Sequence, residues 1–251
     1  AAAAEQSAVF SKNDLLVPVY IDLNVGMNRT GIPPGENAVA LYRLCNTLPG
    51  ITITGLHAYD GHLRDTDFQL RKQKCDTAFN EVLLMKEALL KEKLPTPILI
   101  AGGSPTFSIH SKRENIECSP GTFVYWDKGY SDLCPEQTFL PAVVLVARVI
   151  SLPAPGRVCL DLGHKSVAAE NEISKRIFFL NADGLMPVGQ SEEHLVLETG
   201  PGHSYKTGDV LYGLPWHVCP TVALYEKVYA IEKGKVSGEW KNEARDRRIT
   251  I

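Results

Sequence analysis

The feature that most constrains this chain of 251 residues is a change, near its middle, in the pattern of apolar runs and turns. The first half alternates apolar, β-branched runs with longer stretches of helical character. The second half consists of short strand-like runs separated by Gly, Pro and Asn turns, without a convincing amphipathic helix. Repeated βα units predict a parallel sheet or a (β/α)8 barrel, whereas closely spaced strands predict an antiparallel β domain.

The first half contains four expected strands and two expected helices. The run VPVYIDLNV at 17–25 has the dense apolar character of a strand buried on both faces. The other expected strands lie at 51–59, at 97–103 and within 114–127, and the expected helices at 36–48 and 67–93. The pattern breaks between residues 130 and 139, so we predict two domains, 1–134 and 135–251.

Charge and cysteine usage exclude several classes of function. The formal net charge of −3 gives no basic surface for nucleic acid or an anionic membrane, and no apolar run is long enough to span a bilayer. The six cysteines are scattered without a CxxC pair. This usage is typical of reduced thiols, so we expect a cytoplasmic protein without a nucleic-acid or membrane partner.

Polar residues gather where the expected parallel strands end, which is where sites collect in such folds. The candidates, in chain order, are Arg29; His57, Tyr59, His62 and Asp65; Gly102, Gly103, Ser104 and Thr106; and Gly121 and Thr122. Each has an ordinary alternative. An arginine often makes a surface salt bridge, a tyrosine often packs in a core, and a histidine or aspartate often lies in a solvated loop.

The segment AGGSPT at 101–106 follows a strand, and its glycines let backbone N–H groups approach a phosphate. A tight turn with a Ser or Thr cap is the alternative. The second Gly-Thr end, at the neighbouring strand, favours the phosphate interpretation. Because neither GxxxxGK[ST] nor GxGxxG occurs, we expect a small phosphorylated cofactor rather than a nucleotide.

The segment LPWHVCPTV at 214–222 places His217 two residues before Cys219. On a strand these two side chains share a face, and imidazole with thiolate suits Zn²⁺. Two ligands are too few for a closed structural site, so the pair would form an open one. A buried histidine beside a core cysteine remains the alternative.

Taken together, these segments resemble one family. The segments are IDLNVGMNRTGI, LHAYDGHL, IAGGSPT, ECSPGTFVYWD, LDLGHKSVAAE, SEEH and PWHVCPTV. They resemble the D-threonine aldolase and D-serine dehydratase family, which are fold-type III pyridoxal-phosphate enzymes related to alanine racemase. The resemblance runs from about Val17 to the end. It implies an α/β plus all-β fold, in which a partial (β/α)8 barrel precedes an antiparallel β domain, and a homodimer acting on a small D-amino acid.

The resemblance also implies roles for the candidate residues. It assigns the phosphate of pyridoxal 5′-phosphate to Gly102, Gly103, Ser104, Gly121 and Thr122, and it places Arg29 and Tyr59 close to the pyridine ring. It assigns a divalent metal to His217 and Cys219, with zinc first and manganese or magnesium as alternatives.

Two departures from the family pattern bear on catalysis. The cofactor lysine of the family lies far before the GMxRxG motif, and no matching segment occurs here. We therefore expect that lysine, and roughly 120 residues of barrel, upstream of this chain. Aldolase members carry a histidine base shortly after the Tyr-x-Gly motif; Asp65 stands there, with His62 three residues earlier. The catalytic candidates are therefore His62, Asp65 and Tyr59.

The expected function is that of a lyase dependent on pyridoxal phosphate and a divalent metal, D-threonine aldolase-like, which cleaves D-3-hydroxy amino acids to glycine and an aldehyde. A D-serine dehydratase-like ammonia-lyase is the alternative. A non-catalytic pyridoxal-phosphate-binding protein is a minor alternative, because such carriers lack the second domain and its metal pair. That metal pair also argues against a racemase.

Overall fold

The structure is a computed structural model that describes residues 2–200 and 202–246. It divides the chain into two compact units. Unit 1 comprises Ala1–Gly121 and Leu133–Gln137, and unit 2 comprises Thr122–Asp132 and Thr138–Ile251. The sequence-based boundary at 134/135 stays a prediction about independently folding domains.

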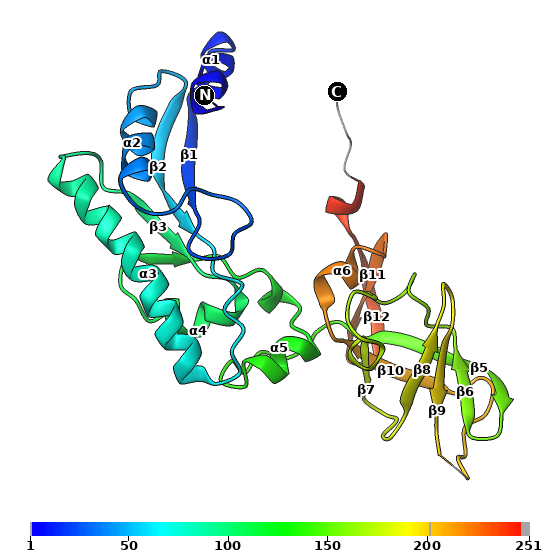
Figure 1. Cartoon of the computed structure of the whole chain (residues 1–251). Coiled ribbons are helices and arrows are strands. Elements are labelled where there is room, and N and C mark those ends of the chain that lie inside the picture. Colours follow the sequence, from blue (N-terminus) through cyan, green and yellow to red (C-terminus); the bar gives the residue numbers. More distant parts are fainter. Residues whose placement is uncertain (1, 201, 247–251) are drawn as a thin grey trace. The chain divides into compact units, whose positions relative to one another are not determined.

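Unit 1 is built on a parallel sheet whose four strands follow the chain order (Figure 1). The strands are β1 (Val17–Leu23), β2 (Ile51–Ala58), β3 (Ile98–Ala101) and β4 (Ile116–Cys118). The helices are α1 (Ala2–Lys12), α2 (Glu36–Cys45), α3 (Phe68–Lys91) and α4 (Phe107–His110), and η1 (Ser104–Thr106) is a 3-10 turn. The four strands match the prediction, whereas the sequence analysis did not predict helix α1.

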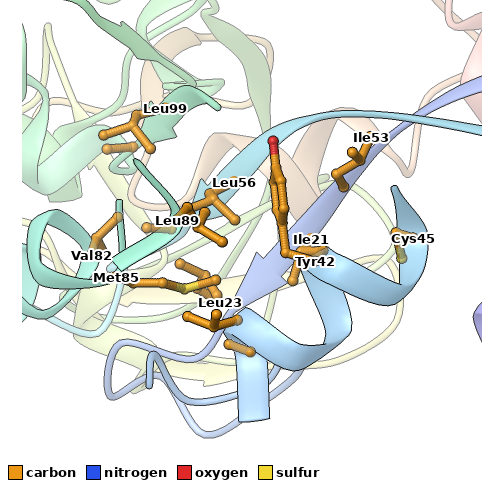
Figure 2. Packing of buried hydrophobic residues seen from close by; sticks show 14 of the residues in the cluster. Ile21, Leu23, Tyr42, Cys45, Ile53, Leu56, Val82, Met85, Leu89 and Leu99 are labelled. Carbon is orange, nitrogen blue, oxygen red and sulfur yellow. The ribbon is translucent and has the colours of Figure 1, made fainter. Parts of the chain in front are cut away.

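The core of unit 1 lies between the sheet and helices α2 and α3. Figure 2 shows Leu56 of β2 beside Tyr42 of α2 and Leu89 of α3, all fully buried. Asp67 caps α3 by accepting the N–H of Leu70 at 2.8 Å, which ends the preceding loop. Burial along β1 alternates, and Tyr20 is exposed. The expectation that this strand is buried on both faces was therefore wrong.

Unit 2 is antiparallel, as predicted. Its six-stranded sheet has the order β7-β10-β5-β6-β9-β8, and β11 pairs with β12 in a separate hairpin. The strands are β5 (Leu145–Ala154), β6 (Arg157–Leu160), β7 (Ile177–Phe179), β8 (Met186–Gln190), β9 (Leu195–Glu198), β10 (Val210–Pro215), β11 (Lys227–Glu232) and β12 (Lys235–Lys241). Its core includes Val158, Leu160 and Leu197, which are fully buried.

Helical segments in the rest of the chain are short. They are η2 (Thr122–Val124), α5 (Lys128–Leu133), η3 (Ile173–Lys175), α6 (Val218–Val222) and η4 (Glu243–Asp246). Within the described residues, no helix combines the length and the apolar character that crossing a bilayer requires.

Candidate functional site

Tyr59 forms the centre of the polar region at the carboxyl end of the unit 1 sheet. It follows β2 directly, and the guanidinium carbon of Arg29 lies 4.7 Å from the centre of its ring. Glycines pack against the ring: a Cβ on Gly61 would lie 2.1 Å from the Tyr59 hydroxyl, and one on Gly103 would lie 2.8 Å from Cε2. The structure thus brings Arg29, Tyr59 and Gly103 together, and the ring is held where only glycines leave room for it.

The two candidate bases have different surroundings. His62 packs on the loop after β1, because a Cβ on Gly26 would lie 2.8 Å from the His62 Nε2 atom. The Nδ1 atom of His62 is buried without a hydrogen-bond partner, which is uncommon for a buried polar atom. The carboxylate of Asp65, in contrast, accepts a hydrogen bond from the Lys74 ammonium at 2.6 Å. The ion pair with Lys74 occupies one of the Asp65 carboxylate oxygens.

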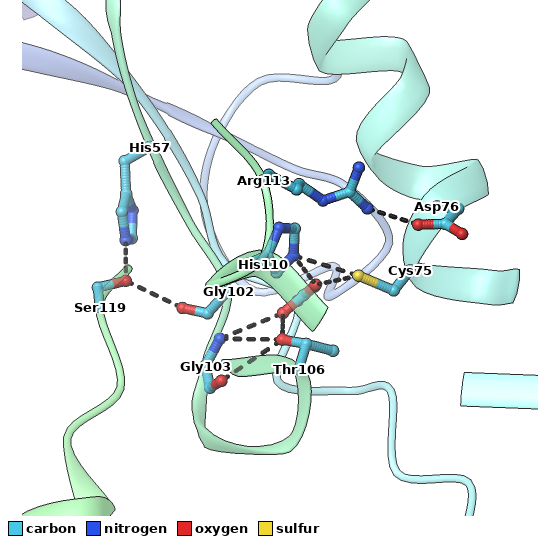
Figure 3. Close-up of polar contacts among 10 residues, drawn as sticks. His57, Cys75, Asp76, Gly102, Gly103, Thr106, His110, Arg113 and Ser119 are labelled. Atoms are coloured by element: carbon cyan, nitrogen blue, oxygen red, sulfur yellow. Dashed lines mark hydrogen bonds and ion pairs between the residues drawn. The ribbon is translucent and has the colours of Figure 1, made fainter. Parts of the chain in front are cut away.

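The loop after β3 is held in place by hydrogen bonds of the backbone of its two glycines, Gly102 and Gly103. The Gly102 N–H donates to the Ala58 carbonyl at 2.9 Å, and the Gly103 N–H donates to the Asp60 carboxylate at 3.2 Å. On the other side, the Ser119 hydroxyl donates to the Gly102 carbonyl at 2.9 Å, as Figure 3 shows. Both glycine N–H groups therefore already have acceptors, and their predicted role as phosphate donors stays a prediction. Gly121 makes no close approach, since a Cβ added there would meet no atom within 4 Å.

A buried polar cluster that the sequence analysis did not identify lies under this loop. It consists of Asp60, Cys75 and His110, which are 3%, 0% and 1% exposed. The Asp60 carboxylate is 2.9 Å from His110 Nε2 and 3.6 Å from Cys75 Sγ. Within the described ranges, this is the group whose ligand-type atoms converge closely enough to hold a metal ion. Its members lie 15 and 50 residues apart, so no sequence spacing revealed it.

The ionisation of this cluster follows from its hydrogen bonds. Burial by itself raises the pKa of Asp60, but hydrogen bonds and charge from His110, Thr106 and Gly103 outweigh burial and hold that pKa below its usual range. Burial, with the Asp60 charge, raises the pKa of Cys75 to about 12. Asp60 is therefore a carboxylate at neutral pH and Cys75 a neutral thiol.

A second series of polar side-chain contacts crosses the sheet. It includes Asp22 of β1, which is in register with His57 on the adjacent strand β2. The Asp22 carboxylate lies 3.0 Å from His57 Nδ1 and accepts the Thr30 hydroxyl at 2.7 Å. His57 Nε2 is in turn 3.4 Å from the Ser119 hydroxyl. Sequence reasoning offered His57 as a strand-end candidate but missed Asp22, Thr30 and Ser119. The alternating burial of β1 gives Asp22 a different face from Ile21 and Leu23.

In unit 2, His217 and Cys219 do not lie on a strand as the spacing argument assumed. Strand β10 ends at Pro215, His217 has an extended conformation just before α6, and Cys219 is the second residue of that helix. The two side chains nevertheless interact. A hydrogen bond with His217 lowers the pKa of Cys219 despite its partial burial, and the same bond raises the pKa of His217. The lowered pKa favours the thiolate, the form that binds metals.

Two further residues complete this site. The Glu170 carboxylate lies 2.6 Å from His217 Nδ1, an arrangement that leaves Nε2 for a metal. The Thr122 hydroxyl lies 3.4 Å from Cys219 Sγ, beside the metal candidate. The assignment of Thr122 to a phosphate stays a prediction. Imidazole, thiolate and an orienting carboxylate are a donor set that fits Zn²⁺.

Two family models match the chain. The model of the alanine racemase N-terminal domain matches residues 1–128, and the one described as "Putative serine dehydratase domain" matches 142–231. Among solved structures, D-threonine aldolase from Filomicrobium marinum has a TM-score of 0.87 at 25% identity, covering 97% of this chain and 67% of that one. D-threo-3-hydroxyaspartate dehydratase from Delftia sp. HT23 has a TM-score of 0.79 at 20% identity, covering 96% and 69%. These matches confirm the predicted fold class.

Two curated proteins are similar in sequence to this chain over nearly its whole length. D-threonine aldolase from Arthrobacter sp. is 28% identical over 91% of this chain and 61% of its own length. The 3-hydroxy-D-aspartate aldolase from Paracoccus denitrificans (strain Pd 1222) is 24% identical over 96% of this chain and 64% of its own length. The chain thus spans somewhat less than two thirds of these relatives. On these matches it belongs to the alanine racemase N-terminal domain family and, within it, to the D-threonine aldolase and D-serine dehydratase group.

Proposed function

We propose that this chain forms most of a lyase that depends on pyridoxal phosphate and a divalent metal and cleaves D-3-hydroxy amino acids by a retro-aldol reaction. The observation that carries the proposal is the joint placement of Arg29, Tyr59 and Gly103 at the carboxyl end of the parallel sheet. The names of the curated relatives, both aldolases of D-3-hydroxy amino acids, support this choice of reaction.

The residues of unit 1 fit the cofactor. The Tyr59 ring and the Arg29 guanidinium offer a flat surface and a fixed positive charge for a planar, anionic group. We assign the phosphate to the loop at Gly102–Ser104 with Gly121, and to Thr122 by resemblance alone. When bound, pyridoxal phosphate acts as an electron sink for charge that develops at the substrate Cα.

The residues of unit 2 fit the metal. We propose that His217 and Cys219 hold it, that Glu170 orients the imidazole, and that the ion is zinc rather than manganese or magnesium, because a thiolate is a soft ligand. A bound divalent ion lowers the pKa of a coordinated hydroxyl. By resemblance, and from the free state of the six cysteines, we also propose a cytoplasmic homodimer.

Between the two candidate bases, the contacts favour His62. Asp65 is engaged by Lys74, and its backbone carbonyl also accepts a hydrogen bond from Arg71. His62 lies against the loop that carries Arg29 and has a ring nitrogen without a hydrogen-bond partner. We propose that His62 accepts the proton of the substrate β-hydroxyl, and that Asp65 keeps the following segment in place.

A product assay on the full-length enzyme tests the proposal. With D-threonine and a divalent metal, we expect glycine and acetaldehyde without ammonia. Replacing His62 with Gln should lower kcat by roughly 10²–10⁴-fold, the usual contribution of a general base. Asp65→Asn is the matched control and should have a smaller effect on kcat. Equal losses in both variants would remove His62 from this role.

The dehydratase reaction is the second candidate, because the serine dehydratase domain model covers the segment containing the His-x-Cys pair. It would release ammonia and 2-oxobutanoate from D-threonine. If these are the main products, the aldolase proposal is wrong, while the cofactor and metal assignments stand. If neither set of products forms, the lyase proposal fails as a whole.

A further inference from the structure

Asp60 lies at the centre of the buried cluster beneath the loop after β3. One carboxylate oxygen, Oδ1, accepts the Gly103 N–H at 3.2 Å and the Thr106 hydroxyl at 2.5 Å. The other oxygen, Oδ2, is 2.9 Å from His110 Nε2 and accepts the Cys75 thiol at 3.6 Å. A single side chain therefore connects both ends of the loop to α3 and α4.

The loop leaves little room for an alternative arrangement. Gly102 has a φ of +84°, and a Cβ there would lie 2.7 Å from the His110 ring. Gly103 packs against Tyr59 in the same way. The Ser119 hydroxyl fixes the Gly102 carbonyl from the opposite side. The hydrogen bonds to Asp60 thus secure a backbone conformation in which Gly103 packs against the Tyr59 ring.

We propose that Asp60 is a positioning residue that holds the Gly102–Thr106 loop in the conformation that receives the cofactor phosphate. Asp60 is 3% exposed and its oxygens are occupied by protein donors, so it acts on the phosphate only through the loop. A loop that is ordered before binding avoids the entropic cost of ordering when the phosphate arrives. This inference rests on the proposed cofactor.

The same three ligand-type residues also suggest a buried metal site, but their hydrogen bonds argue for the positioning role. The pKa of Cys75 is raised to about 12 by burial and by the Asp60 charge, so the thiol keeps its proton and donates it to Asp60. The other Asp60 oxygen is already taken by the loop. Each of the three residues therefore has a partner within the cluster without a metal.

The test compares two cofactors that differ only in the phosphate. In the full-length enzyme carrying Asp60→Asn, we expect the affinity for pyridoxal phosphate to fall by at least about 10-fold, because hydrogen bonds to a buried charge are lost. The affinity for pyridoxal, which lacks the phosphate, should change by less than about twofold. Only binding of the phosphate requires the loop to be ordered, so only pyridoxal phosphate pays the entropic cost of ordering it. Absorbance titration of each cofactor measures both.

Two further variants keep the interpretation unambiguous. Cys45→Ala truncates a buried side chain of the same unit that is not among the contacts of Asp60, and should lower thermal stability without a phosphate-selective loss. Thr106→Val removes one donor to Asp60 while keeping the shape of the side chain, and should give a smaller loss in the same direction. If Asp60→Asn does not fold, Thr106→Val is used in its place in the comparison of the two cofactors.

Three results would overturn the inference. One is an unchanged affinity for pyridoxal phosphate in Asp60→Asn and Thr106→Val, and another is an equal loss for both cofactors. The third is a zinc ion that persists in Cys219→Ala and disappears in Asp60→Asn, which would make the cluster a metal site. A wild-type enzyme that fails to distinguish pyridoxal phosphate from pyridoxal would instead contradict the proposed function.

Discussion

One cysteine differs chemically from the other five. Cys219 is exposed and has a lowered pKa, chiefly because of its side-chain hydrogen bond with His217. The pKa values of the other thiols are raised, chiefly by burial, at Cys45, Cys75, Cys118, Cys134 and Cys159. At neutral pH, thiolate character is therefore concentrated at the position that the sequence analysis assigned to a metal.

Replacing Cys219 with Ala should lower the metal content of the full-length enzyme, because a direct ligand is lost. Glu170→Gln, which weakens only the support of His217, should reduce metal affinity by roughly 10–100-fold, the range for outer partners, and Cys219→Ala should reduce it more. Metal analysis of dialysed protein measures both. Cys159→Ala is the control, and full retention of metal in Cys219→Ala would remove Cys219 from the ligand set.

At the scale of elements, the loops after β2 and β3 are shaped by glycines that make room for aromatic rings. Gly61 and Gly103 both face Tyr59, whereas Gly238, in the β11–β12 hairpin, has no atom within 4 Å of an added Cβ. Replacement by alanine therefore has different consequences at these positions. At Gly103 the added Cβ forces either the Tyr59 ring or the loop after β3 to move.

Gly103→Ala should destabilise the protein by about 1–3 kcal/mol, the usual cost of overpacking, and should weaken cofactor binding by displacing Tyr59. Gly238→Ala is the matched control, with neither effect expected. Urea unfolding gives the free energy of unfolding, and cofactor titration gives the affinity. If Gly103→Ala bound the cofactor as tightly as Gly238→Ala, the Tyr59 ring would not be part of the cofactor site.

At the scale of the whole molecule, the chain has a separate apolar core in each unit. Tyr42, Leu56 and Leu89 belong to the core of unit 1, and Leu160 and Leu197 to that of unit 2. Each core is formed by residues of its own unit, so each can be perturbed by substitutions that leave the other intact.

Leu197→Ala should lower the free energy of unfolding by about 2–5 kcal/mol, because it leaves a cavity in the core of the β sheet. Leu140→Ala is the control; this side chain is 85% exposed, and its truncation should change stability by less than about 0.5 kcal/mol. Chemical denaturation followed by circular dichroism measures both. Similar values for the two variants would contradict the assignment of Leu197 to a core.

The sequence by itself determined the four strands of the first half, helices α2 and α3, and the order of these elements. The strands at Val17–Leu23 and Ile51–Ala58 and the helix at Phe68–Lys91 were predictable, because the period of apolar residues and the breakers at Pro95 and Pro97 are local properties of the chain. The family motifs also located Arg29 and Tyr59, which the structure brings into contact. The antiparallel second half followed from its closely spaced turns.

Only the tertiary structure decided which distant residues meet. Asp60 joins Cys75 and His110 because strand β2, helix α3 and helix α4 converge beneath one loop, and no local pattern encodes that convergence. Glu170 reaches His217 across 47 residues for the same reason. Side-chain hydrogen bonds of this kind depend on packing between elements, so the partners and charge states of a site become known only when the chain is folded.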